Sequence, residues 1–189
     1  MQMKRSARFL SLSLLLAATA LSARAQVDPA ATGRQHSNTA GALASAFQPD
    51  YEGGLVASPS PYCLYGAGAF VDVRFNRWFQ VEAEGRWLRF NQFLNIDEAN
   101  YLLGPRIPIH TFRRFTPYAK VLAGLGKMTF EYNEATGSFT DIAYGGGVDF
   151  KLTRRISARG DFEYQQWPKW VNGSLYPYGA SAGISYKIF

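Results

Sequence analysis

One stretch of the chain is nearly repeated, and it narrows the possible folds more than any other feature. Residues 71–84 read VDVRFNRWFQVEAE and residues 148–161 read VDFKLTRRISARGD, an offset of 77 positions. Each copy holds two segments in which apolar and polar residues alternate, separated by a short polar break at 76–77 or 153–155. Because side chains on a strand point alternately to opposite faces, each copy predicts a β-hairpin with one apolar and one mostly charged face.

Alternation of this kind continues from residue 51 to residue 189. Eight segments show it, at residues 51–58, 64–75, 78–89, 98–109, 116–130, 139–152, 156–167 and 175–189. Short basic connections alternate along the chain with polar or turn-rich ones. The basic connections lie at 76–77, 110–115 and 153–155, and the polar or turn-rich ones lie at 59–63, 90–97, 131–138 and 168–174. This pattern is typical of an all-β fold, an eight-stranded antiparallel up-and-down transmembrane β-barrel, whose strands need about ten residues to cross a bilayer.

The alternation does not by itself decide which face meets water. A soluble ligand-binding barrel would turn its apolar face inward, whereas a membrane barrel would turn that face toward lipid. Ala, Gly and Val dominate the middle of the apolar face and aromatic residues cluster at its ends, as in the interfacial girdles of membrane barrels. Acids and bases nearly balance on the polar face, as confined charges require. These features favour the membrane barrel.

The charged face is therefore expected to fill the barrel interior. An eight-stranded barrel is only wide enough for its own side chains to fill it. We predict a lumen charge network of twelve residues, namely Asp72, Arg74, Glu82, Glu84, Arg86, Arg106, Lys120, Asp149, Lys151, Arg159, Asp161 and Glu163.

The N-terminal residues point to export. Residues 1–25 combine three early bases, a mostly apolar run at 9–21 and the small-x-small pattern Ala23-Arg24-Ala25, which predict a cleaved signal peptide. Residues 26–49 lack strand alternation and are predicted to be a flexible segment, and residues 50–189 are predicted to form the barrel domain. The signal peptide carries four bases and no acid, so the net charge falls from +6 to +2 without it and gives no case for nucleic acid binding.

Several motifs carry a family resemblance: the two hairpins, YLLGPRIPI at 101–109, TPYAKVLAGLG at 116–126 and the terminal aromatic residue. On these motifs the chain from about residue 51 resembles the OmpA/OmpX-like small outer-membrane β-barrel family. The resemblance implies a location in the outer membrane and a terminal residue, Phe189, that the outer-membrane insertion machinery reads. The aromatic residue usual two positions before the end is displaced to Tyr186, and Lys187 takes its place, so either Phe189 leaves strand register or this signal is weaker.

Three functions are open to such a barrel. Its crowded interior favours a plugged envelope protein with a structural role and surface-exposed loops, and a narrow ion-conducting path is the alternative. An enzyme that modifies lipid A is disfavoured, because neither His36 in the leader nor His110 in a tight turn has an obvious Ser and carboxylate set.

The remaining sequence features predict no cofactor chemistry. One cysteine, Cys63, excludes an internal disulfide and gives no zinc spacing, so no catalytic residue, metal site or cofactor is predicted. The expected partners are outer-membrane lipid, lipopolysaccharide and the insertion machinery. The protein is expected to be a monomer.

Overall fold

The structure, a computed structural model, describes residues 37–49, 63–91, 96–129, 136–170 and 173–188. Within these ranges the regular elements are all strands: β1 (Ser37–Gln48), β2 (Leu64–Arg74), β3 (Gln80–Phe90), β4 (Asp97–Pro108), β5 (Phe115–Thr129), β6 (Thr136–Lys151), β7 (Ile156–Trp170), β8 (Gly173–Leu175) and β9 (Tyr178–Lys187). The predicted signal peptide, the predicted strand at 51–58, His36 and Phe189 lie outside the described residues. Over the described ranges, the structure contains no apolar helix of membrane-spanning length.

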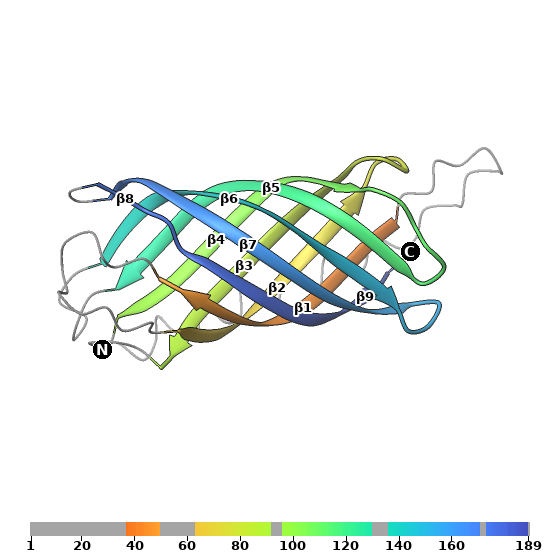
Figure 1. Cartoon of the computed structure of the whole chain (residues 1–189), viewed down its shortest axis with the longest axis horizontal. Coiled ribbons are helices and arrows are strands. Elements are labelled where there is room, and N and C mark those ends of the chain that lie inside the picture. The colour runs from red at the N-terminus through yellow and green to blue at the C-terminus, as the bar shows by residue number, and fades with distance from the viewer. Residues whose placement is uncertain (1–36, 50–62, 92–95, 130–135, 171–172, 189) are drawn as a thin grey trace, which may run out of the picture. The chain divides into compact units, whose positions relative to one another are not determined.

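Eight of these strands close into a ring (Figure 1). Neighbours are hydrogen-bonded in the order β6-β5-β4-β3-β2-β1-β9-β7, and β7 pairs in turn with β6. Every pairing is antiparallel. The three-residue strand β8 continues the hairpin of β7 and β9 beyond the ring, where Trp167 pairs with Leu175. The predicted eight-stranded antiparallel barrel is therefore confirmed.

The first strand of the ring is not the one that the sequence pattern predicts. Residues 37–48, predicted to be part of a flexible segment, form β1 and pair with β2 on one side and β9 on the other. The prediction of flexibility is wrong for these residues. Their inward face carries Leu43, Ser45 and Phe47, while Ala42 and Ala44 face outward, so the alternation is between small residues and is hard to see in the sequence.

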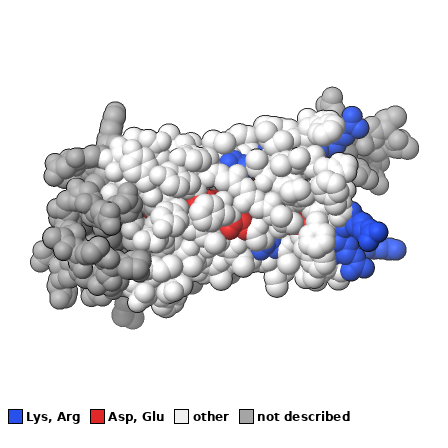
Figure 2. All heavy atoms as spheres, viewed as in Figure 1, with Lys and Arg blue, Asp and Glu red and all other residues white. Residues whose placement is uncertain are grey.

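The apolar face points out of the barrel and the charged face points in. Large apolar side chains on the outer wall are well exposed, with Leu103 at 57%, Phe162 at 53% and Ile184 at 60% of their surface. On the inner face, Glu82 is 0% and Arg159 is 3% exposed. Figure 2 shows that the visible wall of the barrel is mostly uncharged. The orientation expected of a membrane barrel, rather than of a soluble ligand-binding one, is thus confirmed.

Aromatic side chains gather toward both ends of the wall. Near the short turns, the rings of Phe115 and Phe150 lie 4.7 Å apart, and exposed Trp78 stacks under the guanidinium of Arg77. Toward the opposite end, the indole Nε1 of Trp87 donates a hydrogen bond to the hydroxyl of Tyr101 over 3.0 Å. Such amphipathic rings suit the boundary between lipid and water, so the two belts mark the height of the membrane-spanning wall.

A charge placed on this wall should cost more at mid-height than near the turns. Leu103 lies in the middle of β4 and pairs with Ala83 and Ala123, whereas Ile109 lies just beyond β4 at the short-turn end. We expect Leu103→Arg to destabilise the barrel by about 2–4 kcal/mol and Ile109→Arg by about 0–1 kcal/mol, because the penalty falls toward the interface. Reversible denaturant titration in lipid vesicles measures both. Equal losses for the two variants would contradict the assigned bilayer position.

Candidate functional site in the barrel interior

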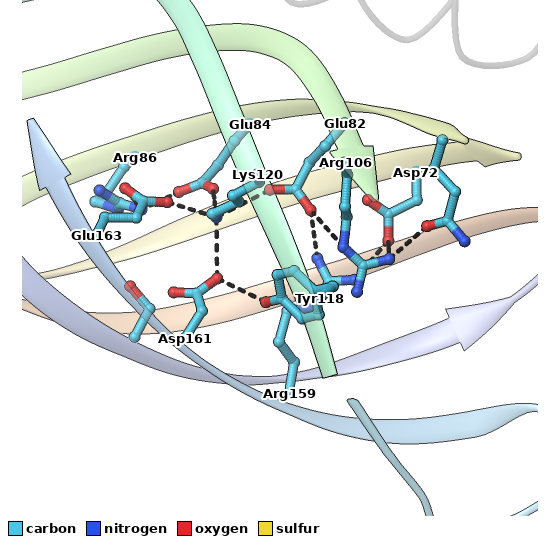
Figure 3. A network of polar contacts seen from close by, with 12 residues as sticks. Asp72, Glu82, Glu84, Arg86, Arg106, Tyr118, Lys120, Arg159, Asp161 and Glu163 are labelled. Atoms are coloured by element: carbon cyan, nitrogen blue, oxygen red, sulfur yellow. Dashed lines mark hydrogen bonds and ion pairs between the residues drawn. The ribbon is translucent and has the colours of Figure 1, made fainter. Parts of the chain in front are cut away.

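The interior is filled by a network of charged side chains from six strands, β2 to β7 (Figure 3). Its labelled members come from β2 (Asp72), β3 (Glu82, Glu84, Arg86), β4 (Arg106), β5 (Tyr118, Lys120) and β7 (Arg159, Asp161, Glu163). They meet because every second residue of a strand points inward. Like charges often neighbour each other within the sheet, as Asp72 beside Glu82 and Arg106 beside Lys120 show. Their closest ion-pair partners therefore come from strands that are not their immediate neighbours in the ring.

The two copies of the repeated hairpin face each other across the barrel axis. In the ring, β3 and β7 are separated by three strands on either side, so they lie opposite each other. Positions related by the 77-residue offset carry opposite charges in two places. Arg159 Nη1 donates to Glu82 Oε2 over 2.8 Å, and Arg86 Nη2 donates to Glu163 Oε2 over 2.9 Å. These two bonds tie opposite walls of the barrel together.

Lys120 lies at the centre of the network. Its ammonium Nζ is 2.9 Å from Glu82 Oε1, 3.0 Å from Glu84 Oε2, 3.0 Å from Asp161 Oδ2 and 2.5 Å from Glu163 Oε1. Three of these acids, Glu84, Asp161 and Glu163, are close enough together to hold a metal ion. The ammonium contacts an oxygen of each of them, so the chain itself supplies the cation that this carboxylate cluster requires.

Two arginines form a second layer on the side of the short turns. Arg159 pairs with Asp72 at 2.5 Å, with Glu82 at 2.8 Å and with Asp149 at 2.9 Å. Arg106 pairs with Asp149 and donates to Gln80 Oε1 over 2.5 Å. Their guanidinium groups also lie over aromatic rings, at 3.7 Å for Arg106 on Tyr118 and 3.8 Å for Arg159 on Phe70. The cations are thus enclosed by both carboxylates and π faces.

Glycine makes room for one of these rings. A Cβ atom at Gly41 of β1 would lie 2.4 Å from the ring of Phe70, too close for any real contact. The missing side chain lets Phe70 lie flat under Arg159 inside the narrow lumen. β1 therefore contributes to the network by leaving space for the Phe70 ring, although residues 26–49 were expected to lie outside the barrel domain.

The opposite end of the lumen is less charged and partly apolar. Arg86, which also pairs with Glu84, stacks on the ring of Phe47 at 4.2 Å, and Phe47 packs with Leu64 and Leu88. Asn100 donates to Asp141 Oδ2 over 2.8 Å and to Gln165 Oε1 over 2.9 Å. Beyond them a buried apolar cluster closes this end of the described barrel; it consists of Ile96, Met128, Trp167 and Leu175.

The structure brings ten of the twelve predicted lumen residues into ion pairs; these are Asp72, Glu82, Glu84, Arg86, Arg106, Lys120, Asp149, Arg159, Asp161 and Glu163. Arg74 is half-buried and Lys151 is exposed at the short-turn end, and neither forms an ion pair with another described residue. The buried acids Glu98 and Asp141 and the ring of Phe47 were not predicted. Glu98 shares the inward phase of Arg106 on β4, and Asp141 shares that of Asp149 on β6, which was sufficient to find both acids.

Removing the central ammonium should destabilise the whole barrel. We expect Lys120→Met to lower the free energy of unfolding by about 3–5 kcal/mol, because it leaves four buried carboxylates without their shared cation. Lys127 on the same strand is exposed, so Lys127→Met should change stability by no more than about 0.5 kcal/mol. Denaturant titration of both variants in the same vesicles gives the comparison. A loss for Lys120→Met as small as that for Lys127→Met would show that the network contributes little.

The fold resembles several small outer-membrane barrels of known structure. The crystal structure of Neisserial surface protein A matches with a TM-score of 0.63 and 14% identity, over 80% of this chain and 97% of the other. The N-terminal β-barrel domain of Pseudomonas aeruginosa OprF matches with a TM-score of 0.55 and 13% identity, over 82% and 100%. The P. aeruginosa outer membrane protein OprG matches with a TM-score of 0.51 and 11% identity, over 81% and 95%. Identities this low show a shared fold alone.

Sequence comparison gives the family. No curated protein matches the chain. A family model described as "Outer membrane protein beta-barrel domain" matches residues 13–187, which is most of the sequence. That family, the closed ring of strands and the outward apolar wall all agree with a location in the outer membrane. The chain belongs to the outer membrane protein β-barrel domain family.

Proposed function

We propose that the protein is a closed envelope barrel with a structural role, and that it does not conduct ions along its axis. The observation that carries this proposal is the pair of cross-lumen bonds, Arg159 with Glu82 and Arg86 with Glu163. Since these bonds join strands on opposite sides of the ring, the side chains meet on the axis itself. An ion on that path would have to separate several buried ion pairs at once, which is costly where little water is present.

The two ends of the lumen support the same proposal. Toward the loops, Trp167 and Leu175 are 0% and 3% exposed, so apolar side chains cover the network on that side. A Cβ atom at Gly126 would lie 2.5 Å from the Trp167 ring, so this glycine lets the indole lie across the lumen. Toward the short turns the lumen widens into a pocket, but that pocket ends at Asp72, Arg106 and Arg159.

The proposal extends to the partners of the barrel. Its apolar wall and aromatic belts suit outer-membrane lipid and lipopolysaccharide, and Phe189 is proposed to be read by the insertion machinery. Among the described residues the ring leaves no strand edge unpaired along its length, which removes the usual route for strand-to-strand association and favours a monomer.

Conductance measurement tests the closed barrel. In planar bilayers bathed in concentrated KCl, we expect the wild-type protein to give no steady current steps above those of protein-free membranes. Insertion is verified on the same samples by unboiled gel electrophoresis, in which a folded barrel migrates differently from the boiled chain. Steady current that shifts in size when Glu84→Gln is introduced would identify a conducting lumen and contradict the proposal.

We also propose that the barrel is not an enzyme. His110 lies exposed after β4 with its ring 4.5 Å from that of Phe112, and it forms no hydrogen bond to a carboxylate or hydroxyl of another described residue. General base catalysis needs such a partner to orient the imidazole. Mass spectrometry of lipid A from cells that express wild-type or His110→Ala protein should give identical profiles. A modification present with wild type and absent with His110→Ala would overturn this proposal.

A further inference from the structure

A pocket of about 630 Å³ occupies the lumen at the short-turn end. It is lined by inward-facing residues of all eight strands of the ring and by residues of the turns at 111–114 and 152–155. Its floor is the layer of Arg106, Arg159 and Asp72 that also blocks the axis. Pockets that bind small molecules commonly have volumes of about 300–1,000 Å³, so this one is large enough for a small ligand.

The lining is strongly basic. Eight bases line the pocket against two acids, and these bases are Arg74, Arg106, Arg114, Lys151, Arg154, Arg155, Arg159 and Lys187. The two acids, Asp72 and Asp149, are both paired with Arg106 and Arg159 in the floor. The floor is therefore neutralised by its own carboxylates. The excess positive charge belongs to the six bases of the wall and rim.

These six bases have no acidic partner in the described part of the chain. Arg74, Arg114 and Lys151 form no ion pair with a described carboxylate, and the same holds for Arg154, Arg155 and Lys187. The Nε atom of Arg74 is buried and has no hydrogen-bond partner among the described residues. Figure 2 shows Lys and Arg side chains gathered at this end of the barrel, in contrast to the mostly uncharged wall. The Nε donor of Arg74 is thus available to an acceptor that enters the basic pocket.

We propose that this pocket binds an anionic ligand through one or more phosphate groups. Guanidinium groups present paired N–H donors that match phosphate oxygens, and four of the six rim and wall bases are arginines. A concave site with low-dielectric walls and one sign of charge also concentrates counter-ions. Because short turns of outer-membrane barrels face the periplasm, the ligand enters from that side. It is either a soluble oligophosphate or the headgroup of an anionic phospholipid.

The position of the pocket favours the soluble ligand. Arg74 and Lys151 line it from strands on different sides of the ring, so the site lies within the lumen and not on the lipid-facing wall. A headgroup tethered to acyl chains in the inner leaflet would have to pass over the rim of basic turns to reach Arg74. A soluble anion reaches it directly along the axis.

Isothermal titration with tripolyphosphate tests the proposal. The full-length protein is placed in nanodiscs of zwitterionic phosphatidylcholine, and we expect saturable binding at one site per barrel. The double variant Lys151→Gln/Arg154→Gln should bind at least about tenfold more weakly, since it removes two charge-assisted contacts. The matched control is Arg77→Gln/Arg113→Gln, which removes two exposed bases from the same end that do not line the pocket. This control should stay within about twofold of wild type.

A second arm distinguishes the two sources of phosphate. Native mass spectrometry is carried out on barrels released from discs that contain phosphatidylglycerol. A lipid adduct that wild type retains and the pocket double variant loses would identify the headgroup as the ligand. Tripolyphosphate binding without such an adduct identifies a soluble anion. Unboiled gel mobility verifies that each variant is folded.

Three results would overturn the proposal. In the first, the pocket double variant binds tripolyphosphate as tightly as wild type. In the second, the control variant loses as much affinity as the pocket variant, which would show nonspecific attraction to a basic rim. In the third, wild type binds neither tripolyphosphate nor phosphatidylglycerol. None of these results bears on whether the axis conducts ions. The proposal of a closed barrel is tested separately, by the conductance measurement.

Discussion

The structure depends on the pairing of charges that the barrel confines. Ten ionisable side chains share a lumen from which bulk water is largely excluded, and each must find a partner there. Lys120 forms ion pairs with four carboxylates, and Arg159 forms ion pairs with three. Because the Arg159–Glu82 and Arg86–Glu163 pairs join opposite walls, the same contacts set the barrel's cross-section and close its axis. The apolar outer wall follows from this arrangement, since alternation sends every other side chain to lipid.

The repeated hairpin made much of the lumen charge network predictable. Alternation that runs through residues 71–84 and 148–161 and continues beyond them placed Glu82, Glu84 and Arg86 on one face, and their counterparts Arg159, Asp161 and Glu163 on the same face of the second copy. The strand bounds from residue 64 onward agree with the prediction to within a few residues. What the pattern could not give was the pairing across the lumen. That pairing depends on ring closure, which puts β3 and β7 opposite each other.

Two parts of the interior escaped prediction for different reasons. β1 is built mainly from Ala, Ser, Gly and Thr, whose alternation carries little hydrophobic contrast, so its strand character comes from its neighbours β2 and β9. Arg74 and Lys151 lie at strand positions that face the lumen, as the alternation predicts. They lie at its short-turn end, however, beyond the carboxylates that pair with the other bases. Phase tells which way a side chain points, whereas depth along the axis decides whether it meets a partner.

The seam between β1 and β9 has a consequence for how the barrel forms. Its pairs consist largely of small residues, such as Ala44 with Ala182, and the Ser45–Ser181 hydrogen bond joins positions 136 residues apart. Joining such distant segments costs the most chain entropy, and small side chains return little contact energy at that step. The other pairings of the ring are between strands adjacent or nearly adjacent in sequence. The β1–β9 seam is therefore the pairing that costs the most chain entropy to close, and we expect it to form after the pairings between strands close in sequence.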